Sequence, residues 1–137
     1  MDYQDAGAVP ASDRNLIQGT GKVSTATYAQ ARRQVDVLRR EIRKVFATVD
    51  LLITPTQRGV AQPIAAPPGA AGGGLVNTAA FDLYGLPTIS VPCGFSRSGL
   101  PIGLQISGNH FSESVVLALA HAYEQATDWH KRRPVLS

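Results

Sequence analysis

The chain has few of the features that stabilise proteins outside the cytoplasm or direct them to a membrane. It contains one cysteine, Cys93, which excludes an internal disulfide and suits a reducing compartment. No apolar run approaches the ~20 residues that a membrane-spanning helix needs. The opening residues, MDYQDAGAVPASDR, are acidic and lack the apolar segment of a secretory signal. We therefore expect a cytoplasmic protein without a membrane partner.

Charge is also scarce. Charged residues make up 17% of the 137 residues, and the net charge is only +3. This small excess of basic residues does not predict nucleic-acid binding, so we expect no nucleic-acid partner. Hydrophobic residues reach 44%, an ordinary composition for a globular chain of a length that supports one modest core.

Glycine and proline divide the chain into predicted elements. They gather between Pro55 and Gly74 and between Gly85 and Gly103, and they place a Pro/Gly-rich loop at residues 57–74. The predicted order is helix, strand, short helix, β-hairpin and helix, which indicates an α/β fold with helices on the faces of a sheet. The elements are a helix at Thr25–Val49, a buried strand at Asp50–Thr54, a helix at Leu75–Tyr84, strands at Thr88–Pro92 and Leu100–Ser107 joined by a turn at Ser96–Gly99, and a helix from the N-cap Ser112 to Ala126.

The first predicted helix is amphipathic. Ser24 or Thr25 is the predicted N-cap, and apolar residues then recur three and four apart as far as Val49. This spacing favours a surface helix lying on a sheet, with a coiled coil as the alternative. The opposite face is basic and is interpreted as solvated rather than as a nucleic-acid surface. The apolar residues are Tyr28, Ala31, Val35, Leu38, Ile42, Val45 and Val49.

No motif in the chain assembles a catalytic site. The glycine run Gly69–Gly74 lacks the Lys-Ser or Lys-Thr of a phosphate loop, and Ser96 does not have the spacing of a nucleophile elbow. Cys93 has no base near it in the sequence, which favours a small buried residue over a catalytic thiol. No two histidines have the spacing of metal ligands, so the residues themselves predict no catalytic group, metal or cofactor. The histidines are His110, His121 and His130.

The ordered motifs of the chain nevertheless resemble one family. They are TYAQARRQ at 27–34, VDLLITPT at 49–56, GLPTISVPCG at 85–94, GLPIGLQI at 99–106 and HAYEQAT at 121–127. This set resembles the C-terminal end of the amidase signature family. The resemblance implies that residues 1–137 form a single partial domain. It would be the C-terminal part of a mixed β-sheet layered between helices, in a three-layer α/β/α arrangement.

The resemblance also implies a reaction, the hydrolysis of a carboxamide to a carboxylic acid and ammonia. Family members use a Ser–cis-Ser–Lys triad with backbone N–H groups that stabilise the oxyanion, and they need no cofactor. The lysines of this chain are Lys22, Lys44 and Lys131, and none precedes a Ser-rich glycine loop. We therefore expect the triad to lie outside this chain, no catalytic residue within it, and no activity of the chain alone.

The resemblance implies that this chain supplies part of the wall of the acyl pocket, which binds a small-molecule amide. It assigns to that wall Thr54 and Pro55, at the end of a predicted strand, and Leu75, Thr78 and Phe81, in the short helix. Glutamine-dependent transamidase relatives place an acidic residue near the start of that helix. Here GGGLVNTAAF has none, which favours an apolar or small amide over glutamine.

Two other functions stay open from the sequence. The chain could be a non-catalytic association module that reuses this region and forms a homo-oligomer to cover its sheet edges. It could also be a basic helical interaction protein whose helix at 25–49 pairs with a partner.

Overall fold

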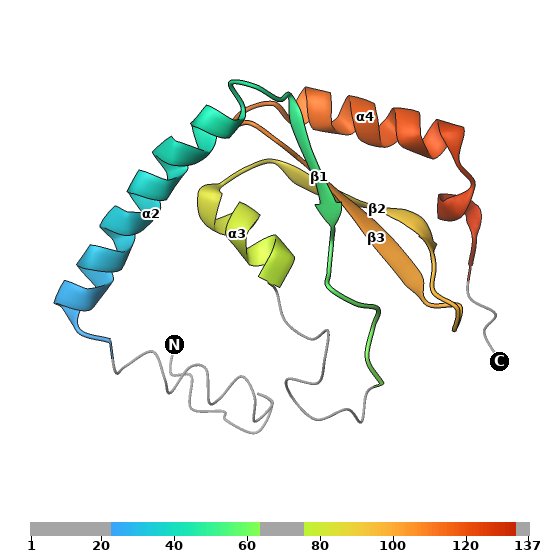
Figure 1. The fold of residues 1–137 in the computed structure, drawn as a ribbon, viewed down its shortest axis with the longest axis horizontal. Coiled ribbons are helices and arrows are strands. Elements are labelled where there is room, and N and C mark those ends of the chain that lie inside the picture. Colours follow the sequence, from blue (N-terminus) through green and yellow to red (C-terminus); the bar gives the residue numbers. More distant parts are fainter. Residues whose placement is uncertain (1–22, 64–75, 134–137) are drawn as a thin grey trace, which may run out of the picture. The chain divides into compact units, whose positions relative to one another are not determined.

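The computed structural model describes residues 23–63 and 76–133, so Leu75 and residues 64–74 of the predicted loop lie outside the described residues. The chain divides into two compact units, Met1–Val37 and Leu38–Ser137. The boundary falls within a continuous helix, and the sheet and all later elements belong to the second unit. Figure 1 labels the elements. They are α2 (Thr25–Val45), β1 (Leu51–Pro55), α3 (Val76–Tyr84), β2 (Thr88–Phe95), β3 (Pro101–Gly108), α4 (Glu113–Ala126) and the 3₁₀ turn η1 (Trp129–Lys131).

Helix α2 begins as predicted and ends earlier than predicted. The Oγ of Ser24 accepts the N–H of Thr27 at 3.1 Å, which confirms Ser24 as the N-cap. The helix ends at Val45 because the next N–H groups turn back over three residues, with Thr48 N donating to Val45 O at 3.1 Å. The Thr48 hydroxyl donates to the same carbonyl at 3.0 Å, so a β-branched side chain competes for the acceptor that would extend the helix.

The three strands form one antiparallel sheet in the order β1-β3-β2. Ile106 at the centre of β3 lies opposite Ile53 of β1 and Ile89 of β2. Within the described residues β1 pairs only with β3, and its Ile53 is 55% exposed. The prediction that this strand is fully buried is therefore wrong, because an edge strand has a neighbour on one side only.

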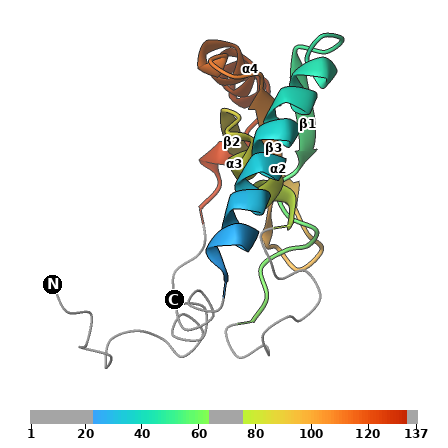
Figure 2. The same ribbon diagram turned by 90° about the vertical axis from the view of Figure 1, so that its left-hand side faces the viewer.

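The core lies between the sheet and α4. Val91 and Ile106 from the sheet pack against Val116 and Ala120 of α4, and all four are buried. Ile106 is fully enclosed. The views in Figures 1 and 2 both place α4 beside the strands. Alternation along β3 turns Leu104, Ile106 and Gly108 towards this apolar layer.

The opposite face of the sheet is polar. It carries Gln105 and Ser107, which are 1% and 0% exposed, and the Thr88 hydroxyl donates to the Ser107 hydroxyl at 2.9 Å. Helix α3 contacts this face, because the side-chain amide of Gln105 donates to the Asn77 carbonyl. Within the second unit, helix, sheet and helix therefore form three layers, which confirms the predicted α/β class.

Glycine ends α3 as the sequence predicts. Gly85 has a φ of +70°, a left-handed conformation that glycine adopts without a Cβ clash. Its N–H donates to Asp82 O at 3.1 Å, and Leu86 N donates to Phe81 O at 3.1 Å. These two bonds are those of a Schellman motif, which satisfies the last carbonyls of the helix and redirects the chain into β2.

The start of α4 differs in part from its prediction. Ser112 occupies the N-cap position as expected, but its side chain makes no capping hydrogen bond. Its hydroxyl donates instead to Asn109 O at 2.7 Å. Phe111, with a φ of +63°, turns the chain immediately before the helix. The hydroxyl of Ser112 therefore stabilises this preceding turn rather than the first N–H groups of the helix.

The end of β2 is anchored to the C-terminal turn. The ring of Trp129 in η1 lies 6.2 Å from that of Phe95, at a tilt of 53°. The guanidinium of Arg132 lies 5.2 Å from both ring centroids, a cation–π arrangement. The turn after α4 is thus held against the end of β2 through Trp129, while Lys131, Arg132 and Arg133 stay exposed.

None of the helices that the structure describes is long and apolar enough to cross a membrane.

Candidate functional site

The carboxyl end of β1 is tied to the first turn of α3 by two side-chain amides. The Asn77 Nδ2 donates to the carbonyl of Pro55 at 2.9 Å. The Gln105 Nε2 donates to the Thr54 hydroxyl and to the Asn77 carbonyl, each at 3.3 Å. The Asn77–Gln105 pair therefore joins three elements that are far apart in the sequence.

Gln105 is an unusual residue for its position. It lies in the central strand between two apolar residues, and only 1% of its surface is exposed. A buried amide without partners costs about 1–3 kcal/mol, so its two hydrogen bonds are required in this place. Because the two acceptors come from β1 and α3, the amide is satisfied only when both elements are in position.

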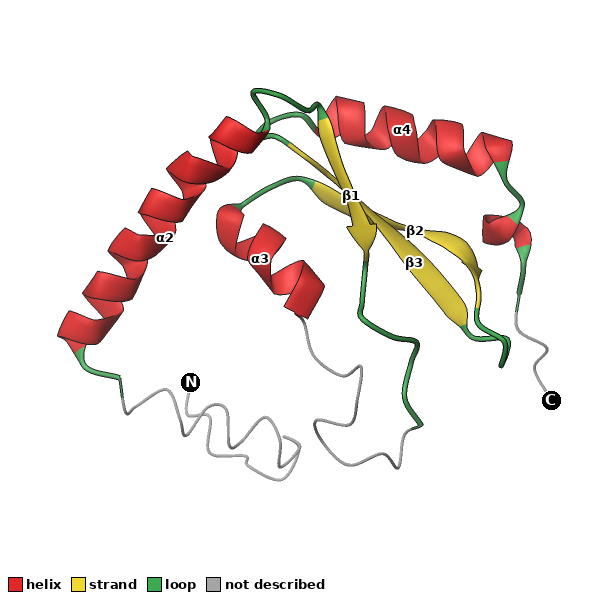
Figure 3. Ribbon diagram, viewed as in Figure 1, coloured by secondary structure: helices red, strands yellow, loops and turns green. Residues whose placement is uncertain are grey.

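A groove opens beside this junction. It has a volume of about 780 Å³ and lies between the segment that follows β1 and the β2–β3 hairpin. Figure 3 shows this segment as the loop that leaves the end of β1. Most of the lining is apolar, and Arg58 is its one charged residue among those described. We call this the β1 groove; it is lined by residues 55–62, 90–92 and 101–103.

The sheet floor of the β1 groove is closely fitted. The Thr56 N–H donates to Gly103 O at 2.9 Å, which extends the β1–β3 pairing beyond the strand. The hydroxyls of Thr56 and Ser90 hydrogen-bond to each other across β3. Gly103 lies beneath them, and a Cβ on it would meet the Thr56 and Ser90 hydroxyl oxygens at 2.6 and 2.7 Å. Glycine is thus required for this hydroxyl pair.

The structure brings together some of the residues predicted for a pocket wall. Thr54 and Pro55 both bond to the Asn77–Gln105 pair, and Pro55 lines the β1 groove. Thr78 and Phe81 follow in α3 and are half-buried, but neither lines the groove. Leu75 lies outside the described residues. Contact of any of them with a substrate stays a prediction.

Four residues of this region were not predicted from the sequence: Asn77, Gln105, Thr56 and Ser90. A signal for two of them was present, because Ser90 and Gln105 interrupt the apolar residues of the hairpin on one face of the sheet. Polar residues at alternate positions of a predicted strand indicate a polar face. The roles of Asn77 and Thr56 depend on contacts across the chain, and no local pattern indicates them.

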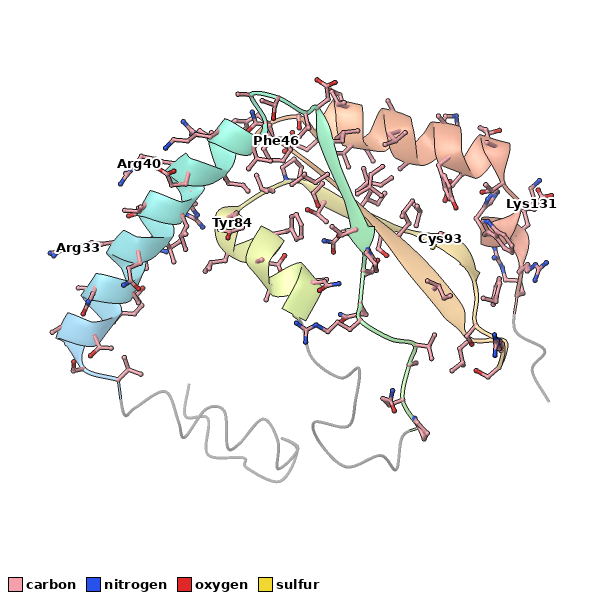
Figure 4. The ribbon with its side chains drawn as sticks, viewed as in Figure 1. Arg33, Arg40, Phe46, Tyr84, Cys93 and Lys131 are labelled. Carbon is pink, nitrogen blue, oxygen red and sulfur yellow. The ribbon has the colours of Figure 1, made fainter. Side chains whose placement is uncertain are left out.

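Cys93 is half-buried at a β-bulge, where the register shifts between Pro92 and Gly94 (Figure 4). Its thiol donates to Ile102 O at 3.5 Å. The expectation of a buried residue is therefore only half met, because the bulge places Cys93 where the sheet is locally open.

The histidines do not gather into a site in the described ranges. His110 bonds through Nε2 to Tyr84 O at 3.0 Å, and His121 is exposed on α4. Across residues 23–63 and 76–133 no group of three His, Cys, Asp or Glu side chains could hold a metal ion. One carboxyl is electrostatically perturbed, since the hydrogen bond and charge of Lys131 lower the pKa of Asp128.

Curated proteins similar to this chain include amidotransferase subunits. The chain is 39% identical over 130 residues to a glutamyl-tRNA(Gln) amidotransferase subunit from Thermodesulfovibrio yellowstonii, covering 90% of this chain and 27% of that protein. It is 42% identical over 130 residues to the subunit of the same name from Geobacillus stearothermophilus, with the same coverage. The chain therefore spans about a quarter of the length of these relatives.

Solved structures of amidases share the fold. The native peptide amidase of Stenotrophomonas maltophilia is 34% identical with a TM-score of 0.67, covering 87% of this chain and 24% of that one. A 6-aminohexanoate cyclic dimer hydrolase is 27% identical with a TM-score of 0.73, covering 98% and 30%. The amidase family model matches residues 4–117 of this sequence. With a match of that extent, and with a sheet and helices arranged as in solved amidases, the chain belongs to the amidase family.

Proposed function

We propose that this chain is the C-terminal part of an amidohydrolase that converts a carboxamide to a carboxylic acid and ammonia, and that it forms one wall of the acyl pocket. The observation that carries the proposal is the junction of β1 with α3. In a chain of the amidase family, Asn77 and Gln105 hold Thr54, Pro55 and the first turn of α3 together at the edge of the β1 groove.

In this proposal the nucleophile lies on the part of the protein that this chain does not contain. A serine of a Ser–cis-Ser–Lys triad attacks the amide carbonyl, and the lysine accepts its proton through the middle serine. The C–N bond then breaks, ammonia leaves, and water hydrolyses the acyl-enzyme to release the acid. The residues of this chain shape the acyl side of the pocket, and the chain alone has no amidase activity.

The lining of the β1 groove supports an apolar or small acyl group. Pro55, Val60, Pro92 and Ile102 give its walls an apolar character. Asp82, the first acidic residue of α3, is exposed and is not part of the lining. Glutamine is the second candidate substrate, because the curated relatives are named as subunits of a glutamyl-tRNA(Gln) amidotransferase.

The test measures ammonia release by two proteins. One is the 137-residue chain, and the other is the product of the complete reading frame that encodes it. The substrates are propionamide, hexanamide, benzamide and L-glutamine. We expect release only by the second protein, with hexanamide and benzamide preferred over glutamine. Release by the 137-residue chain would contradict the assignment of the triad to another segment. Absence of release by the complete product would contradict the amidohydrolase assignment.

One observation favours a second candidate function, a non-catalytic association module. The apolar face of the second half of α2 is open and continues to Val49, with Leu38, Val45 and Val49 each about 40% exposed. On this alternative the face pairs with a second copy of the chain. Sedimentation equilibrium distinguishes the two functions, because a module of this kind is a dimer that hydrolyses none of the four amides.

A further inference from the structure

The geometry points to Gln105 and Asn77 as positioning residues that set substrate affinity. They would act by fixing the main chain of Pro55 at the edge of the β1 groove. This inference rests on the proposed function and adds to it the residues that hold the pocket wall in place. Neither side chain lines the groove, so both would act through Pro55 and the first turn of α3.

The contacts of the Asn77–Gln105 pair span the chain. Gln105 reaches Thr54 across 51 residues and the Asn77 carbonyl across 28, and Asn77 reaches Pro55 across 22. Two of the three acceptors are main-chain carbonyls. The pair therefore fixes backbone positions, and side-chain adjustment at the acceptors cannot compensate for its loss.

The position of these contacts predicts an effect on substrate affinity in addition to the effect on stability that any buried hydrogen bond has. A second polar contact lies on the same face of the sheet, where Thr88 donates to the fully buried Ser107. That contact joins β2 to β3 at the end of the sheet away from Pro55. Loss of either contact lowers stability, but of the two only the Asn77–Gln105 contacts lie beside the groove, so only their loss would loosen its edge.

A leucine in place of Gln105 has a similar size and cannot donate a hydrogen bond. The Thr54 hydroxyl and the Asn77 carbonyl would lose this partner, and the bond from Asn77 to Pro55 would be the remaining one of the three that join β1 to α3 at this junction. Alanine at Asn77 leaves the bond from Gln105 to the main-chain carbonyl of residue 77 and removes the bond from α3 to the Pro55 carbonyl. Because the reacting groups lie elsewhere in the proposed enzyme, the Michaelis constant would rise while kcat changes little.

The experiment compares Gln105→Leu, Asn77→Ala, the double variant and Ser107→Ala in the product of the complete reading frame, with hexanamide as substrate. We expect each single variant to raise KM about tenfold, with kcat within about twofold. The double variant removes all three hydrogen bonds of the junction, so it should raise KM at least as much as the larger single effect. Ser107→Ala should lower Tm and leave KM unchanged.

An unchanged KM in an active Gln105→Leu protein would overturn the inference, as would an equal rise in KM for Ser107→Ala. If Gln105→Leu does not fold, Asn77→Ala tests the junction through the bond of a half-buried side chain to Pro55. A wild-type product that hydrolyses none of the four amides would overturn the proposed function, and this inference with it. The wild-type measurement therefore distinguishes a failure of the proposed function from a failure of this inference alone.

Discussion

Replacing Gly103 with alanine tests the close fit at the floor of the β1 groove. The added Cβ would lie 2.6 Å from the Thr56 hydroxyl oxygen and 2.7 Å from that of Ser90, whereas ordinary contacts begin at 3.4 Å. The overlap is thus about 0.7–0.8 Å on two sides. The hydroxyls must separate, or the hairpin must move away from the segment after β1.

The expected cost follows from three contributions. Overpacking of this kind costs about 1–3 kcal/mol. Loss of the Thr56–Ser90 hydrogen bond adds up to about 1 kcal/mol. Alanine also reduces the backbone entropy of the unfolded chain, which raises the free energy of unfolding by about 0.4–1 kcal/mol. We therefore expect Gly103→Ala to lower the free energy of unfolding by about 2 kcal/mol.

Urea denaturation followed by circular dichroism measures this change. The control is the same substitution in a Thr56→Ala, Ser90→Ala background, where both hydroxyls are absent and the cost should fall by at least about half. A neutral or stabilising effect of Gly103→Ala in the otherwise unchanged chain would refute the reasoning. An equal cost in the two backgrounds would refute it as well, because the hydroxyls would then not be the obstacle.

Three further predictions concern the C-terminal turn and α2. Arg132→Ala removes the cation from both aromatic rings, so Trp129 fluorescence should shift to longer wavelength; an unchanged spectrum would contradict the contact. The pKa of Asp128 should lie below its ordinary value in a carbon-13 NMR titration and return to it in Lys131→Met. Because this pKa is lowered on folding, its stabilising effect is present above the unfolded pKa and is lost as pH falls through the folded one. Leu38→Asp should abolish any concentration-dependent helicity, and if helicity is independent of concentration in the unchanged chain, pairing through α2 is wrong.

The helices and the hairpin were predictable from local sequence signals. Ser24 indicated the start of α2 and Gly85 the end of α3, and the structure places Gly85 in the left-handed conformation that a helix end of this kind needs. The turn at Ser96–Gly99 is confirmed by the bond from Ser96 N to Leu100 O at 2.8 Å. Each of these signals acts over a few residues, which explains why the sequence alone reveals it.

What the sequence could not predict depends on distant contacts. The edge position of β1 follows from its pairing with β3, and the apolar run at Leu51–Thr54 indicates a strand without indicating how many neighbours it has. The same holds for the candidate site. The motif resemblance indicated Thr54 and Pro55, but only the fold shows that Gln105 bonds to the first and Asn77 to the second.

The strand order has a consequence for how the sheet assembles. Strands β2 and β3 are joined by a short turn and can pair as soon as both are synthesised, whereas Thr54 meets Gln105 across 51 residues. At about 5–20 residues per second, the ribosome delivers β3 roughly 3–10 s after β1. Strand β1 is made before the other two, and because its partner β3 is far away in the sequence, we expect β1 to pair last. Pulse-labelled hydrogen exchange during refolding should show protection in β2 and β3 before β1, so the wall beside the groove would be the last part of the sheet to form.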